Sequence, residues 1–241
     1  MKKRMTVLLA VLLIVSLLAA CGGEPAVSGT VEPVTQATTL PEETTEATEA
    51  TEGAPLEIGR LQGGVYTNTY LGITCTLDES WTYQSAQELQ QLPENIEELL
   101  QGTQVGDYMT QYTQLLDMKA DNQTDLTGVN VVFTKMSIKE QVAYALMDDQ
   151  GIVESTLSQK DLLIESYTQA GMPVEEMEMV TVQYLGKDRP AIRTKCTLQG
   201  VPYYVLQVFE YQKGSYGATI TASSFVEDKT QQALALFQPL Q

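Results

Sequence analysis

Four consecutive strand-like runs near the C-terminus constrain the fold more than any other feature of the chain. They read "VEEMEMVTVQYLG", "RPAIRTKCTL", "PYYVLQVFEYQ" and "SYGATITASSF". The links "GKD" and "GV" between the first three are short, whereas parallel strands need a crossover of a dozen or more residues. The runs therefore predict an antiparallel meander over residues 174–225.

The third run is apolar on both of its faces. Tyr204, Leu206 and Val208 alternate with Val205 and Phe209, and successive strand residues point to opposite faces. A strand buried on both faces lies inside a sheet that is covered above and below. We therefore predict an α+β fold: a mostly antiparallel β-sheet flanked by helices in α/β/α layers.

The runs "VYTNTY" and "GITCTL" predict two further strands. The runs "YTQLLDMKA" and "GVNVVFTKM" predict a β-hairpin around the polar segment 121–127. Capping residues and apolar spacing predict the helices. We expect two short helices over residues 85–102, divided at Pro93. A third helix is expected from Ser137 to about Met147, and a fourth is opened by Ser158 and Asp161 and ends at Gly171. The last helix is expected over residues 227–237. In the helix that Ser158 opens, Leu163, Tyr167 and Ala170 share one face; in the last helix, Ala233, Leu234 and Phe237 point inward.

The N-terminus has the pattern of a secretory signal peptide. Three basic residues precede an apolar run of 16 residues, which is short for a membrane-spanning helix of about 20. The residues "LAAC" that end at Cys21 resemble the lipobox of bacterial lipoproteins. That resemblance implies that residues 1–20 are removed and that Cys21 is lipidated, which would hold the protein on the extracytoplasmic face of the bacterial membrane. The alternative is a secreted protein with an incidental cysteine.

Residues 21–58 predict a disordered linker. Between residues 22 and 57 there are eight Thr, eight Glu and four Pro, with no Lys, Arg or aromatic residue. Such a segment buries too little apolar surface to offset the entropy of ordering. We expect the globular domain to span residues 59–241.

Charge and composition exclude several classes of function. The full chain carries a net charge of −17; without residues 1–20 it keeps 11 basic against 31 acidic residues, a charge of −20. Nucleic acid is therefore not an expected partner, because phosphates require a basic face. The chain has no histidine, which excludes imidazole catalysis and histidine-containing zinc sites.

Cys75 and Cys196 lie in strand-like runs and share faces with apolar neighbours: Ile73 and Leu77 for the first, Ile192 and Leu198 for the second. This pattern favours buried free thiols. An extracytoplasmic location would also permit a disulfide, so the sequence leaves the state of the two thiols open.

The segment "GITCTLDESWTY" and the meander that follows it resemble the Mog1/PsbP-like fold. The resemblance spans about residues 64–238. Asp78, Glu79 and Ser80 replace the proline and glycine that often precede the tryptophan in that family. The family consists mostly of non-enzymatic accessory or partner-binding proteins, so the resemblance implies a binding role.

Several groups of residues are candidate sites. Trp81, Tyr83, Tyr66 and Tyr70 are candidates for an aromatic surface that binds a ligand or a partner, although aromatic residues at strand ends also pack core rims. The oxygen-rich group Asp117, Asp121, Asn122 and Asp125 suggests calcium, against the simpler interpretation of a solvated turn.

Two charged groups complete the candidates. Arg189, Arg193 and Lys195 form a basic patch. We expect Arg193 and Lys195 to pair with the glutamates of the preceding strand; the alternative is an anion-binding site. Paired carboxylates such as Glu175, Glu176 and Glu178, or Asp148 and Asp149, are the groups that a glycosidase would need.

We therefore predict a lipid-anchored lipoprotein with a non-catalytic binding or accessory domain, no cofactor and no metal. Its expected partners are the membrane, through the lipid, and a protein of the cell envelope. The alternative is a small-molecule or glycan-binding lipoprotein, or a hydrolase that uses carboxylates.

Overall fold

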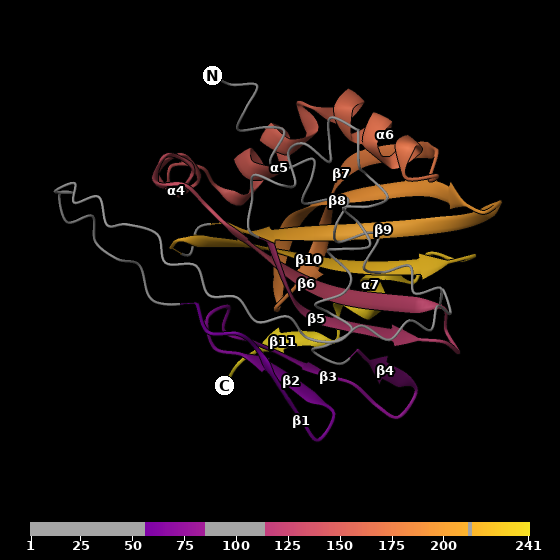
Figure 1. Ribbon diagram of the computed structural model, residues 1–241, viewed down its shortest axis with the longest axis horizontal. Coiled ribbons are helices and arrows are strands. Elements are labelled where there is room, and N and C mark those ends of the chain that lie inside the picture. Colours follow the sequence, from indigo (N-terminus) through magenta and orange to yellow (C-terminus); the bar gives the residue numbers. More distant parts are fainter. Residues whose placement is uncertain (1–55, 85–113, 212–213) are drawn as a thin grey trace, which may run out of the picture.

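The computed structural model describes residues 56–84, 114–211 and 214–241 (Figure 1). The strands are β1 (Arg60–Gln62), β2 (Val65–Asn68), β3 (Ile73–Thr76), β4 (Trp81–Tyr83), β5 (Gln114–Asn122), β6 (Thr127–Lys135), β7 (Val174–Tyr184), β8 (Lys187–Leu198), β9 (Val201–Glu210), β10 (Tyr216–Phe225) and β11 (Phe237–Pro239). The helices are α4 (Ile138–Ala145), α5 (Asp149–Leu157), α6 (Lys160–Gln169) and α7 (Thr230–Leu234). The predicted α+β fold class is confirmed.

The large sheet has seven strands in the order β4-β5-β6-β10-β9-β8-β7. Its neighbouring strands are all antiparallel. The predicted meander is confirmed as β7 to β10, and the predicted hairpin is β5 with β6. The hairpin loop is shorter than expected, because pairing continues as far as Asn122 opposite Thr127.

The central strand β9 is buried on both faces, as its sequence predicts. Val205 and Phe209 lie in one apolar cluster with the helices. Leu206 and Val208 lie in a second cluster on the opposite face. The sheet therefore separates two cores.

The small sheet has the order β1-β2-β3-β11, and it corrects the prediction for the last helix. The helix is only α7, and the chain then straightens so that Phe237 pairs with Cys75. Phe237 is buried as expected, but it is a strand residue. Pairing with β11 satisfies backbone groups of β3 that would otherwise lie at a sheet edge.

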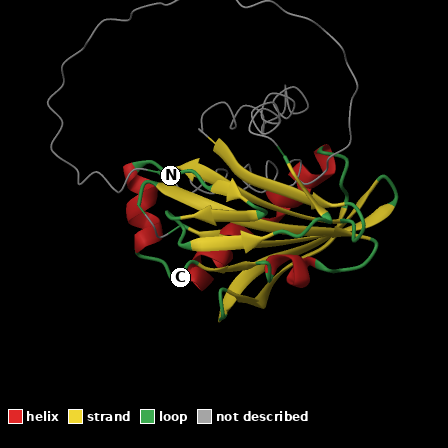
Figure 2. Cartoon of the chain, turned by 90° about the horizontal axis from the view of Figure 1, so that it is seen from below, coloured by secondary structure: helices red, strands yellow, loops and turns green. Residues whose placement is uncertain are grey.

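The two faces of the large sheet have different covers. Helices α5 and α6 pack on β7, and α5 also reaches β8 and β9. On the other face, residues of the small sheet and of α7 share one core with β5, β6 and β10. Figure 1 shows α4, α5 and α6 at the β7 end of the large sheet and the small sheet at the β5 end. Seen from below in Figure 2, short helices lie around the stacked strands.

The expected α/β/α layering is confirmed only in part among the described residues. Helices α5 and α6 cover one face, and α7 packs on β6, β9 and β10 at the other, where a small β-sheet that was not expected lies beside it. The strands predicted from "VYTNTY" and "GITCTL" are confirmed as β2 and β3. Strands β1 and β11 have only three residues each, too few to be recognised by periodicity, which explains why the small sheet was not expected.

Two of the predicted helix starts can be compared with the structure. Helix α4 begins after Ser137, as predicted. Ser158 does not open a helix: it is the C-cap of α5, and its hydroxyl donates to the Ser155 carbonyl at 2.7 Å. Helix α5, which the prediction lacks, begins after Asp148, whose carboxylate accepts from the Gly151 amide.

Helix α6 begins without a side-chain cap, and it buries the predicted Leu163 and Tyr167. Ala170, predicted on the same face, is the C-cap residue of this helix. The signal peptide, Cys21 and the helices expected over residues 85–102 lie outside the described residues.

Asp117 joins the two sheets. It lies at the register shift of β5 between Leu116 and Met118 and is buried. Its carboxylate accepts hydrogen bonds from the Gly59 amide at 2.9 Å, the Tyr66 hydroxyl at 2.6 Å and the Asn68 side-chain amide at 2.8 Å. A buried carboxylate needs such donors, so Asp117 is a structural residue here.

Candidate interaction surface

The N-terminus of α4 is fixed by a capping box. The Glu140 amide donates to the Ser137 hydroxyl at 3.3 Å, and the Glu140 carboxylate accepts from the Ser137 amide at 2.8 Å. Two backbone donors that an isolated helix leaves without partners are thereby satisfied. Gln141 adds a hydrogen bond from its side chain to the Met136 carbonyl at 3.0 Å.

One face of α4 is anchored by Tyr144. Its side chain is fully buried, and its ring centroid lies 5.0 Å from that of Tyr211. Gly217 leaves room for Tyr211, because a Cβ at this glycine would overlap the ring. These contacts fix the rotation of the helix about its axis.

The opposite face of α4 is aliphatic and exposed. Ile138 is 66% exposed, Val142 58% and Leu146 84%. The three follow the i, i+4, i+8 spacing that places residues in one row along a helix. We call this row the α4 surface.

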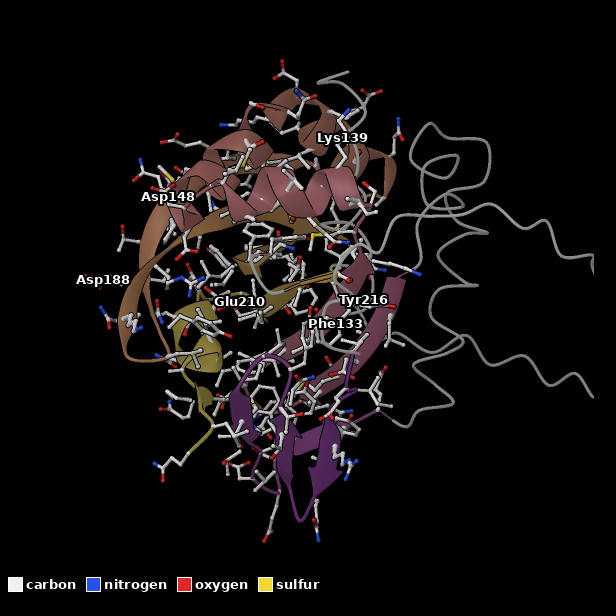
Figure 3. All side chains as sticks on the ribbon, turned by 90° about the vertical axis from the view of Figure 1, so that its left-hand side faces the viewer. Phe133, Lys139, Asp148, Asp188, Glu210 and Tyr216 are labelled. Carbon is white, nitrogen blue, oxygen red and sulfur yellow. The ribbon has the colours of Figure 1, made fainter. Side chains whose placement is uncertain are left out.

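The α4 surface has a charge of opposite sign at each end. Lys139 lies in the first turn of the helix, and Asp148 follows its last turn. Figure 3 shows these two residues at opposite ends of α4. Lys135 at the end of β6 is also exposed.

An exposed aliphatic row indicates an interaction surface, whereas a buried row indicates only core packing, because large apolar groups in contact with water favour association. Sequence analysis predicted this helix but missed the surface. The spacing of Ile138, Val142 and Leu146 was visible in the sequence. Spacing alone does not show which side of a helix faces the core. In α4, the side that carries Tyr144 faces the core.

The predicted aromatic surface does not exist as one group. Tyr66 is fully buried between the two sheets and donates to Asp117, which corrects its assignment to a binding surface. Burial, the nearby Asp117 charge and this hydrogen bond all raise the Tyr66 pKa. The residue is part of the core.

The other three aromatic residues pack at the rim of the same core. The Tyr70 ring lies edge-on to Phe133 at 5.6 Å, and its hydroxyl donates to the Tyr216 carbonyl at 3.0 Å. Trp81 and Tyr83 occupy β4, the edge strand of the large sheet, and are partly buried. All three remain partly exposed and pack against this core.

The four oxygen-bearing residues proposed for calcium are held by separate partners. Asp117 is at the sheet junction, Asp121 pairs with Lys119 at 3.1 Å, and Asp125 pairs with Lys229 at 2.8 Å. Asn122 accepts from the backbone amides of Thr124 and Asp125 in the hairpin loop. Within the described residues, no three acidic or cysteine side chains are grouped as a metal site.

The cross-strand ion pairs predicted for Arg193 and Lys195 are confirmed. Arg193 contacts Glu178, and Lys195 lies 2.6 Å from Glu175. Arg189 instead lies 2.7 Å from Asp149 in α5 and 3.2 Å from Glu210 in β9. The candidate carboxylates Glu175, Glu178 and Asp149 are therefore each engaged by a cation.

A polar row crosses the face of the large sheet opposite the small sheet. Lys119, Asn130, Thr221 and Gln207 are neighbours in register on four adjacent strands, and all four are fully buried. Gln207 donates to the Thr221 hydroxyl at 3.4 Å. Burial raises the Asp121 pKa, and the adjacent Lys119 opposes this shift. Sequence analysis missed this row, because its members are far apart in the chain.

The two described cysteines are buried and free, as the sequence favoured. Cys75 belongs to the core between the sheets and Cys196 to the core beneath the helices, so the large sheet separates them. Burial raises the Cys75 pKa to about 12, and a protonated, buried thiol is unreactive.

Comparison of the chain with protein-family models gives no match, and comparison with curated proteins gives none. Among the described residues, no helix is long and apolar enough to span a membrane. The function must therefore be argued from the residues themselves.

Proposed function

We propose that this protein is a lipoprotein anchored through Cys21 to the extracytoplasmic face of a bacterial membrane, where its domain acts by binding an envelope protein and not by catalysis. The lipobox-like "LAAC" supports the anchor. The α4 surface is the observation that carries the binding role. Three aliphatic side chains held in water by a well-anchored helix are suited to a protein contact.

The use of charged groups also supports binding over catalysis. In the described residues, the carboxylates of Asp117, Glu140 and Glu210 are buried, and each has a structural partner. A catalytic acid needs a position facing substrate and a tuned environment. These three carboxylates hold sheets, a helix cap and an arginine in place instead.

The finer fold assignment is also a proposal. We propose a Mog1/PsbP-like domain, on the basis of the strand that leads to Trp81 and the antiparallel meander that follows. The accessory or partner-binding role common in that family agrees with a protein-binding surface on α4.

The anchor is tested by Cys21→Ser in the producing cell, with the protein followed in membrane and soluble fractions. We expect the variant to leave the membrane fraction. Retention of the variant in membranes at the wild-type level would overturn the anchor.

The binding role is tested by chemical crosslinking of the full chain in intact cells. We expect Val142→Asp to remove crosslinked protein products, because a charge at the centre of the α4 surface opposes desolvation. The matched control is Gln150→Asp, at an exposed position of α5. Equal loss in both variants, or loss in neither, contradicts the proposal.

The polar row supports a second function, the binding of a small polar molecule. Lys119 is fully buried on a sheet face shared with Asn130, Gln207 and Thr221, and converging polar groups are typical of ligand sites. Thermal unfolding in the presence of inorganic phosphate and of monosaccharides tests this candidate. It is supported if a ligand raises the midpoint in wild type but not in Lys119→Met, and absence of any shift rejects it for those ligands.

A further inference from the structure

We infer that the occupant of the α4 surface is a second copy of this chain, with the two α4 helices antiparallel and crossing at Val142. The inference rests on the proposed function, since it takes the α4 surface to be a protein-binding surface. The arrangement of residues on the α4 surface indicates which partner binds there.

The aliphatic row is complementary to itself. Val142 lies midway between Ile138 and Leu146, so a two-fold axis through Val142 brings Ile138 of each copy opposite Leu146 of the other. Residues four apart form the ridges that interlock when two helices pack. One patch then serves both copies, as in most dimers of identical chains.

The charges agree with the same arrangement. In an antiparallel pair, Lys139 of one copy lies near the end of the other α4, where Asp148 is located. The helix dipoles also oppose each other. Elsewhere two copies repel, because each anchored chain, without residues 1–20, carries 11 basic against 31 acidic residues, a net charge of −20. The α4 surface, with Lys139 and Asp148 at its ends, is locally balanced and permits close approach.

The size of the surface sets the strength of the contact. Three aliphatic side chains cover much less than the roughly 800 Å² per partner of a typical stable complex. We therefore expect weak association of chains that are free in solution. Lipid anchoring confines the chains to one membrane surface and raises their effective concentration, which favours the pair.

The test places one new thiol at the expected axis. In membranes that contain the full chain, Val142→Cys should form a disulfide-linked product of twice the chain mass under mild oxidation. The native Cys75 and Cys196 are buried, and the lipid proposed on Cys21 occupies its sulfur, so the native cysteines do not interfere. The control is Glu165→Cys, an exposed position in α6, which should give at least tenfold less dimer. Equal yields from the two variants would overturn the inference.

A charge reversal at Lys139 tests the antiparallel arrangement in the Val142→Cys background. Lys139→Asp places like charges together and should lower the dimer yield. Asp148→Asn keeps a side-chain acceptor for the cap of α5 but removes the charge, so adding it to Lys139→Asp removes the repulsion and should recover the yield. If the double variant has the circular dichroism spectrum of the wild type but does not recover the dimer yield, the antiparallel pairing is contradicted.

A photoreactive amino acid at position 142 separates this inference from the proposed function. A product of twice the chain mass supports the second copy. A product that contains only another protein overturns the second copy and leaves the protein-binding role intact. Labelling of lipid alone, or no product, overturns both.

Discussion

The Tyr66 hydroxyl donates a 2.6 Å hydrogen bond to the buried Asp117 carboxylate, and this contact joins the small sheet to the large one. Asp117 also accepts from Gly59 and Asn68. We expect Asp117→Asn to lower the free energy of unfolding by about 2–3 kcal/mol, because the amide replaces an acceptor by a donor and removes the charge. Urea unfolding measures this loss.

Tyr66→Phe is the control for Asp117→Asn, since it removes a single donor. It should cost about 1 kcal/mol. A loss from Tyr66→Phe as large as that from Asp117→Asn would mean that Asp117 does not act through its other donors.

Stability should decrease in alkali. Burial raises the Cys75 pKa from 9.0 to about 12 and raises that of Tyr66, so the folded chain keeps protons that the unfolded chain releases. The free energy of unfolding is therefore highest below about pH 9 and falls as pH increases towards 12. Each such group contributes a slope of about 1.4 kcal/mol per pH unit.

Urea titrations between pH 8 and pH 10.5 measure this slope. Cys75→Ala removes one titrating group, so its curve should fall less steeply above pH 9 even though the variant is less stable at pH 7. A wild-type stability that rises with pH in this range would contradict the assignment.

Arg189 connects α5, β8 and β9 through Asp149 and Glu210. We expect Arg189→Met to destabilise the protein by about 3 kcal/mol, because it leaves Glu210 buried without its cation. Lys195→Met is the matched control, since the Lys195 and Glu175 pair is exposed and should change the urea midpoint little. If Arg189→Met and Lys195→Met reduce the stability by similar amounts, the buried ion pair contributes no more to stability than the exposed one.

Gly217 controls the position of α4 indirectly. A Cβ at this residue overlaps the Tyr211 ring, and Tyr211 contacts Tyr144 in α4. Gly217→Ala should therefore cost about 1–3 kcal/mol. In the Tyr211→Leu background, the same substitution should cost less, because the smaller side chain leaves space. If thermal unfolding shows that Gly217→Ala costs as much stability in the Tyr211→Leu background as in the wild type, the overlap with the Tyr211 ring is not the cause of the loss.

The large sheet was predictable because its signals are local. Alternation in β9 and the short links of the meander depend on neighbouring residues, and Ser137 with Glu140 lies within one turn. The small sheet was not predictable in the same way, because β11 pairs with β3 from the other end of the domain. Short strands carry too little periodicity to compete with an apparent helix such as residues 227–237.

The candidate sites were predictable in the same way: those set by neighbouring residues were predicted, and those set by distant residues were not. The pairs Arg193 with Glu178 and Lys195 with Glu175 are set by strand neighbours, and they were predicted. Tyr66 was assigned to a surface because its burial depends on Asp117, which lies on a distant strand. The polar row and the orientation of the α4 surface depend on packing across the whole fold, and no local spacing encodes them.

The pairing of β11 with β3 has a consequence for how the chain acquires its structure during synthesis. Strand β3 is made long before β11, its second neighbour. The core between the sheets, with Tyr66, Cys75 and Phe237, therefore cannot close until β11 has been made. Contacts so distant in sequence form slowly, so the newly made chain exposes this apolar surface until β11 is available.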